Sequence, residues 1–175
     1  FTNSPFLVSI SSTNDSKGLF LRDKDGFPLV IDHFSGELKR FSEKGVKPSL
    51  TKSYLNDEGT FKTVFSLLTE KYLDNSYSPK SVAPQCGLKE EQILSLADDI
   101  ATTAFNKSTF IEQSWVDFRG EKRSGFTGRP VSFHAMRGIS AHSNGFQTCR
   151  AIHLLQILIG SVDVPGGFRY KPPYP

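Results

Sequence analysis

The stretch MRGISAHSNGFQTCRAIHLLQILIGSVDVPGG, residues 136–167, decides how the C-terminal part of this chain folds. It opens with small and polar residues and continues into an apolar run that predicts a helix from about 144 to 159. It closes on a Pro-Gly-Gly turn at 165–167. Just before it, PVSFH (130–134) predicts a short strand. The order strand, polar loop, helix is the one that dinucleotide-binding α/β domains use.

The polar loop between the predicted strand and helix has the residue types of an anion-binding loop. The start of a helix leaves backbone N–H groups without partners and carries partial positive charge. Glycines let such groups approach a phosphate closely, and Arg137 adds a planar cation that suits phosphate oxygens. The loop also contains Gly138, Ser140, Ser143, Asn144 and Gly145. It is neither G-x-G-x-x-G nor a Walker loop, so a plain Asn144-Gly145 helix cap stays open as an alternative.

Two further kinds of chemistry are open to the same region. His142 with a serine is a minimal hydrolase pair, although no G-x-S-x-G elbow is present. Cys149 and His153 are four residues apart on the predicted helix and could face one metal ion. No second ligand pair accompanies them, and Cys86 lies too far away in sequence for a CxxC site. Packing inside the protein is therefore the simpler role for both cysteines.

Upstream of this region the sequence changes from strand-like to helix-like patterns. Apolar runs within 6–34 predict short strands, with a hairpin turn at Asp25-Gly26. From about Thr60 the apolar residues follow a helical spacing. A short helix is predicted after Ser78, with Pro79 at its first position and Gly87 at its end, and KEEQILSLADDIATTAF predicts a longer one. We therefore expect an α/β protein, mixed α+β when the chain is alone, with a hairpin-rich segment 1–58 and a helical segment 59–175 that contains a cofactor loop at 130–145.

The composition is that of an ordinary globular chain, with 37% hydrophobic and 22% charged residues among 175. No apolar run is long enough for a membrane span, and no secretory signal is present. The chain begins with Phe1 and its one methionine is Met136. We therefore expect a fragment of a longer polypeptide, with RYKPPYP (169–175) as the start of a connection.

Positive charge is concentrated between residues 119 and 150. Six basic residues stand there against Glu121 alone, a local excess of 6 − 1 = +5 in a chain whose net charge is +3. The six are Arg119, Lys122, Arg123, Arg129, Arg137 and Arg150. Clustered charge of one sign favours an anionic partner. A non-catalytic module that docks on a partner subunit or an anionic surface is therefore the rival hypothesis, and a solvated basic loop is the plain one.

The residues from Gly128 onward, GRPVSFHAMRGISAHSNGFQTCRAIHLLQILIGSVDVPGGFRYKPPYP, resemble a segment of the large catalytic subunits of the dimethyl sulfoxide reductase family of molybdopterin oxidoreductases. The resemblance is to the branch of thiosulfate, polysulfide and sulfite-oxidising enzymes. Upstream stretches such as GLFLRDKDGFPLVID and SPKSVAPQCGLKEEQILSLADDIA fit the same subunits less specifically.

This resemblance implies a cofactor and residues that contact it. Members of the family hold molybdenum or tungsten between two pterin dithiolenes, each with a guanine dinucleotide. By position, Arg137 and Ala141 match the sites that contact this cofactor, although relatives often carry glutamine where this chain has Ala141. The resemblance also implies a cofactor-binding role, less directly, for the neighbouring residues Gly138, Ser140, His142, Ser143 and Asn144.

The resemblance also implies what the chain lacks and what its parent contains. Neither the family's cluster-binding cysteines nor a metal-ligand residue has a counterpart here, so the parent's 4Fe-4S cluster lies outside this segment and the 175 residues alone should be inactive. The implied parent is an electron-transport oxidoreductase, bacterial, acting on sulfur oxyanions in the cytoplasm or periplasm. Its implied partners are the rest of the catalytic subunit, an iron–sulfur subunit for electron transfer, and a membrane anchor subunit. No nucleic acid is expected, and apolar surface left bare in the fragment predicts self-association.

Overall fold

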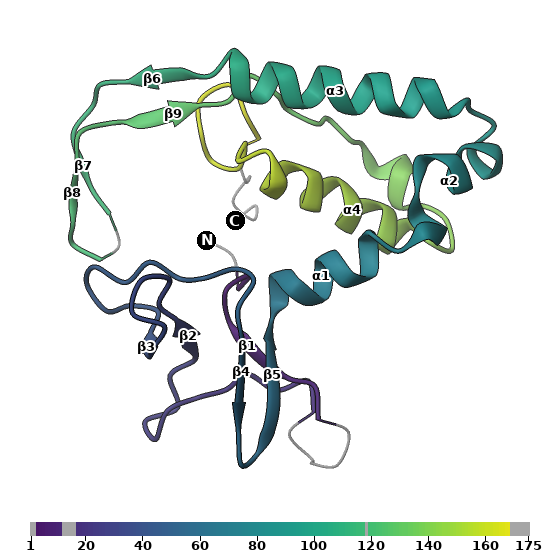
Figure 1. Ribbon diagram of the computed structural model, residues 1–175. Coiled ribbons are helices and arrows are strands. Elements are labelled where there is room, and N and C mark those ends of the chain that lie inside the picture. Colours follow the sequence, from purple (N-terminus) through teal and green to yellow (C-terminus); the bar gives the residue numbers. More distant parts are fainter. Residues whose placement is uncertain (1–2, 12–16, 118, 169–175) are drawn as a thin grey trace. The chain divides into compact units, whose positions relative to one another are not determined.

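The computed structural model describes residues 3–11, 17–117 and 119–168, which form two compact units, Phe1–Val82 and Ala83–Pro175 (Figure 1). Strands at the N-terminus are followed by helices, so the predicted mixed α+β class is confirmed. The units divide between Val82 and Ala83, whereas the segments expected from the sequence meet between 58 and 59. The expected connection RYKPPYP lies outside the described residues.

The first unit is built on a three-stranded antiparallel sheet in the order β1-β5-β4. Its strands are β1 (Leu7–Ser9), β4 (Ser53–Asn56) and β5 (Gly59–Thr63). A second antiparallel pair joins β2 (Leu29–Ile31) to β3 (Leu38–Arg40). The two pairings meet in a small core of Leu7, Ile31 and Phe61, against which Leu21, Leu38 and Tyr54 pack.

The helix predicted from about Thr60 begins later than expected. Residues 59–63 form β5, and the helix α1 runs over Val64–Tyr72. Thr63 explains the change, because its side chain accepts the backbone N–H of Ser66 and caps the helix there. Phe61, whose spacing predicts a helical position, is a core residue of the strand with 2% of its surface exposed. The turn predicted at Asp25-Gly26 is confirmed, with Gly26 at a φ of 83° between the bridged residues Arg22 and Pro28.

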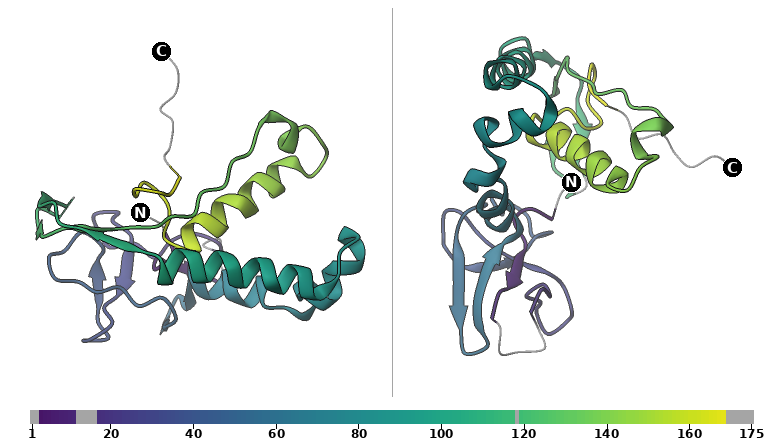
Figure 2. Two further views of the ribbon diagram at one scale, coloured as in Figure 1. Left: turned by 90° about the horizontal axis from the view of Figure 1, so that it is seen from above. Right: turned by 90° about the vertical axis from the view of Figure 1, so that its right-hand side faces the viewer.

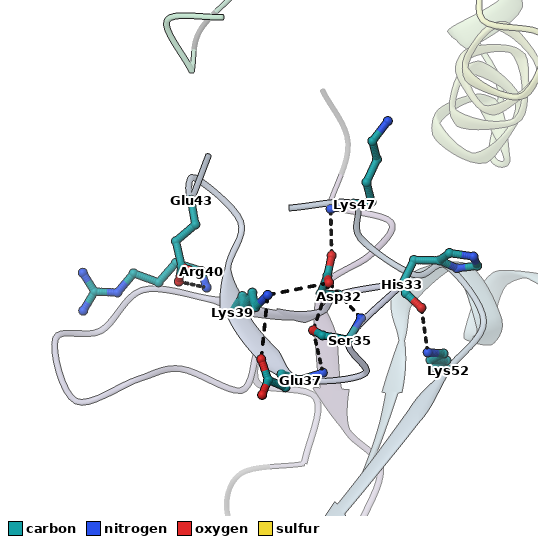
Figure 3. Close-up of polar contacts among 9 residues, drawn as sticks. All are labelled: Asp32, His33, Ser35, Glu37, Lys39, Arg40, Glu43, Lys47 and Lys52. Atoms are coloured by element: carbon teal, nitrogen blue, oxygen red, sulfur yellow. Dashed lines mark hydrogen bonds and ion pairs between the residues drawn. The ribbon is translucent and has the colours of Figure 1, made fainter. Parts of the chain in front are cut away.

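A buried carboxylate holds together the loops that follow β2 (Figure 3). Asp32 accepts hydrogen bonds from the backbone N–H of Lys47 at 2.9 Å, the backbone N–H of Ser35 at 3.0 Å and the hydroxyl of Ser35 at 2.9 Å, and Lys39 lies 3.7 Å away. The N–H donors of Lys47 and Ser35 hold the pKa of Asp32 well below its usual range, with Lys39 adding to the effect. Every oxygen of this carboxylate is engaged locally, so Asp32 is a structural tie between loops.

The second unit combines helices with one long hairpin, and its elements are seen from two sides in Figure 2. After η1 (Asn75–Tyr77), α2 (Pro79–Cys86) spans the junction of the units and α3 runs over Glu90–Asn106. The hairpin consists of β6 (Thr109–Ile111) with β9 (Phe126–Gly128) and β7 (Trp115–Val116) with β8 (Lys122–Arg123). The predicted start of α2 at Pro79 after Ser78 is confirmed, as is its end at Gly87, which has a φ of 68°.

The strand predicted at 130–134 is wrong. The last strand, β9, ends at Gly128, and 129–136 continue as extended backbone without ladder pairing. Pro130 has no N–H to give to a ladder, and none of the described segments lies beside these residues as a pairing partner. In Figures 1 and 2 this extended segment runs alongside α4 in the opposite direction.

The C-terminal helix α4 covers Gly145–Leu158, between Asn144 and Ile159, as predicted. This helix is more exposed than its apolar sequence suggests. Its buried residues are Gly145 and Gln156, whereas Phe146 is 75% exposed and Leu158 54%. The Pro-Gly-Gly turn after it packs against β9, because Arg129 donates its backbone N–H to Pro165 O at 3.0 Å.

Candidate cofactor loop and adjoining cavity

All seven residues predicted to contact a cofactor lie in one exposed loop between the extended segment and α4. Its first part is a 3-10 turn, η2 (Arg137–Ser140), in which Ser140 Oγ donates to Arg137 O at 2.9 Å. The backbone N–H of Ala141 donates to Gly138 O, so only its carbonyl is available to another molecule. A side chain added at Gly138 would meet nothing within 4 Å, and the loop is therefore open to solvent there.

The beginning of α4 leaves two backbone donors available. Asn144 occupies the N-cap position, but its side chain makes no capping bond and instead contacts His142 Nδ1. The N–H groups of Phe146 and Gln147 have no partner among the described residues. Gly145 is required here, since a Cβ on it would clash with the backbone of Ser140. The loop therefore folds tightly onto the helix and presents its first-turn donors outward.

Beneath the loop, a cavity of about 290 Å³ lies between the extended segment and α4. Its walls are mostly apolar, and its polar groups come from Arg137 and Ser140 on the loop and from α4. The complete lining is Phe133, Ala135, Met136, Arg137, Ile139, Ser140, Cys149, Ile152, His153, Gln156 and Phe168. Of the seven predicted residues, Arg137 and Ser140 line this cavity, while Gly138, Ala141, His142, Ser143 and Asn144 do not.

Gln156 is the most unusual member of this lining. It is 1% exposed, and its Oε1 is buried with no hydrogen-bond partner among the described residues. A buried acceptor left without a donor costs about 1–3 kcal/mol, and native proteins contain few of them. The cavity therefore contains an unmet acceptor, which a hydrogen-bond donor from another molecule or segment would satisfy.

The two residues considered as metal ligands share this cavity. Cys149 and His153 both line it, and the His153 ring packs edge-on against Phe168 with ring centroids 5.9 Å apart. Within 3–11, 17–117 and 119–168, three or more His, Cys, Asp or Glu side chains do not gather at any point that could hold a metal ion. An aromatic packing role for His153 follows from its contact with Phe168.

The basic cluster is partly neutralised inside the chain. Arg123 donates to Asp117 at 2.7 Å and to Glu121 at 2.6 Å. Burial alone would raise the pKa of Asp117, but the hydrogen bond from Arg123 and two backbone N–H groups lower it below its usual value. Arg129 donates to Ala104 O at 2.9 Å and lies 5.0 Å from the centre of the Phe105 ring. These partners leave fewer free cations for an anionic surface than the sequence count implied.

Comparison with known proteins finds one informative similarity. Over an alignment of 187 residues the chain is 35% identical to a subunit of the sulfite dehydrogenase of Allochromatium vinosum. The match covers 100% of this chain and 19% of that relative, so the chain spans about one fifth of the relative's length. No family model matches the chain, and no solved structure does. The chain is thus similar throughout to one part of a much larger enzyme subunit.

The residues of this cavity wall on α4 that sequence reasoning missed are Ile152 and Gln156, whereas Cys149 and His153 were considered there only as metal ligands. Cys149, Ile152, His153 and Gln156 follow the spacing i, i+3, i+4, i+7, which places them on one side of α4. That spacing is visible in the sequence. It does not distinguish a cavity wall from an ordinary packed helix face, whereas a glycine-rich loop before a helix is where anions usually bind. None of the described helices is long and apolar enough to cross a membrane.

Proposed function

We propose that this chain is a segment of the catalytic subunit of a molybdopterin oxidoreductase whose parent enzyme converts sulfite or related sulfur oxyanions. The observation that carries the proposal is the match of the whole chain to part of a sulfite dehydrogenase subunit. The resemblance of 128–175 to dimethyl sulfoxide reductase-family subunits supports the choice of cofactor. A match to only 19% of the relative is in keeping with an enzyme assembled from this segment and others.

In this proposal the loop at 130–145 lies against the dinucleotide arm of the cofactor. The residues present fit such a group. Arg137 is exposed and takes part in no ion pair among the described residues, and its guanidinium suits phosphate oxygens. The unpartnered N–H groups of Phe146 and Gln147 add donors at the positive end of a helix. Where relatives carry glutamine, Ala141 can offer only its carbonyl.

The division of labour in the parent follows from this arrangement. When bound, the molybdenum cofactor supplies the two-electron redox chemistry. This segment contributes binding and orientation, because its loop offers a permanent cation and backbone donors but no group positioned as a metal ligand among the described residues. The metal ligand and a 4Fe-4S relay would come from other segments. The isolated chain should therefore neither bind nor convert a sulfur substrate.

The test is cofactor content in the longer polypeptide that contains these residues. Produced with molybdate, it should contain molybdenum and pterin, and Arg137→Gln should lower both. Arg150→Gln is the matched control, since Arg150 is an exposed arginine of α4 that does not line the cavity. An active sulfite-converting preparation that holds neither molybdenum nor pterin would disprove the proposal. Equal cofactor loss from the two variants would disprove the role of Arg137.

A further inference from the structure

The extended segment before the loop has backbone groups that satisfy no hydrogen bond. From Ser132 to Ala135, neither the N–H nor the C=O groups have a backbone or side-chain partner among the described residues. The segment is not a turn or a helix, and it runs alongside α4 (Figures 1 and 2). A row of unpaired peptide groups on extended backbone is the edge of a sheet that has not been completed.

The side chains of this segment alternate as they do in a strand. Phe133 and Ala135 line the cavity, while Ser132 and His134 do not. Alternate residues of a strand point to opposite sides, so one face of the segment is already packed toward α4 and the segment has the geometry of a half-buried strand. What it lacks is a neighbour in the hydrogen-bonding direction.

A second observation, independent of the backbone, points the same way. Gln156 Oε1 is buried on the floor of the cavity and has no donor among the described residues. Around it the walls are mostly apolar, from residues such as Ile139, Ile152 and Phe168. The missing occupant must therefore bring apolar groups and one hydrogen-bond donor. A polypeptide has both, in an apolar side chain and a backbone or hydroxyl donor.

We propose that residues 132–135 are one strand of a sheet that an extended polypeptide segment from outside residues 3–168 completes, and that this segment closes the cavity and donates a hydrogen bond to Gln156. Apart from the guanidinium of Arg137, no permanently charged group lines the walls, so the partner strand is uncharged where it faces the rest of the cavity. It belongs to the same longer polypeptide: the matched relative is about five times as long as this chain, and α4 exposes Phe146, Leu155 and Leu158 for further covering. The identity of that polypeptide rests on the proposed function.

Hydrogen–deuterium exchange tests this proposal in three preparations. They are the 175-residue chain, the longer polypeptide made without molybdate, and the longer polypeptide made with molybdate. The readout is exchange at Ser132–Ala135, with Phe126–Gly128 of β9 as the internal reference because that strand is paired already. We expect fast exchange in the 175-residue chain. In both longer forms these amides should exchange at least roughly tenfold more slowly than in that chain.

Each alternative outcome overturns the proposal in a distinguishable way. If the amides of Ser132–Ala135 are protected only when molybdate was supplied, the cavity is occupied by the cofactor and not by a strand. Protection that grows with concentration in the 175-residue chain makes the occupant a second copy. Fast exchange in every preparation means that the edge stays open. Cofactor content is measured in the same samples. In the preparation made with molybdate, protection without molybdenum or pterin refutes the proposed function alone, and cofactor without protection refutes the strand alone.

Discussion

Replacing Gln156 by methionine should stabilise the isolated chain, which is the opposite of what removing a buried polar side chain usually does. The side chain of Gln156 is 1% exposed, and its Oε1 has no donor among the described residues. Methionine has nearly the same length and similar helix propensity, so it fills the space without the unmet acceptor. Because such an acceptor costs about 1–3 kcal/mol, Gln156→Met should raise the free energy of unfolding by at least about 1 kcal/mol.

The measurement uses a reporter that the second unit already contains. Trp115 is the one tryptophan of the chain and lies on β7 in the same unit as Gln156. Its fluorescence follows thermal or urea unfolding of that unit, and a gain of about 1 kcal/mol corresponds to roughly 4–8 °C in Tm for a unit of this size. Gln147→Met is the control, because Gln147 is exposed on the same helix and its replacement should change stability by less than about 0.5 kcal/mol.

A lower unfolding midpoint for Gln156→Met, with the midpoint of Gln147→Met unchanged, would refute this reasoning. The side-chain amide of Gln156 would then have a hydrogen-bond partner in solution. In the longer polypeptide, Gln156→Met should lower stability instead of raising it. There the proposed strand donates to Gln156, and methionine would leave that donor buried without an acceptor.

Further predictions concern the rest of the chain. The folded-state pKa of Asp32 lies below its unfolded value of 3.8, so the contribution of this carboxylate to stability is complete above about pH 4 and is lost as the pH falls further. The NMR signals of the Ser35 and Lys47 amides should therefore shift only in that acid range. The variant Asp32→Asn should disturb the same signals at neutral pH. Exposed apolar residues of α4 predict a size-exclusion volume that falls with increasing concentration, and a concentration-independent monomer would contradict this. Under the docking hypothesis, Lys122→Glu should weaken binding of a partner subunit without changing cofactor content, whereas loss of cofactor would exclude that hypothesis.

Local patterns predicted those parts of the fold whose partners are close in sequence. The helix α2 starts at Pro79 because Ser78 and Pro79 favour that position themselves, and α4 ends where its apolar run ends. The start of α1 was misplaced because Phe61 fits both a helical and an alternating spacing. Its pairing with Tyr54 across the sheet, seven residues away, determined the outcome. A spacing rule evaluated on one segment contains no information about which other segment will pair with it.

The candidate site shows the same limit at longer range. An exposed loop before α4 was predictable because glycine and a helix start act locally, and all seven candidate residues lie in it, whereas their contact with a cofactor stays a prediction. The cavity was not, since it requires Phe133 to face Gln156 across 23 positions of sequence. The failed strand at 130–134 is informative for this reason. Its composition and alternation are those of a strand, and its side chains already point as a strand's do, yet its peptide groups have nothing to bond among the described residues. A correct local pattern that stays unpaired, beside a buried acceptor that stays unsatisfied, locates the place where another segment should pair with this chain.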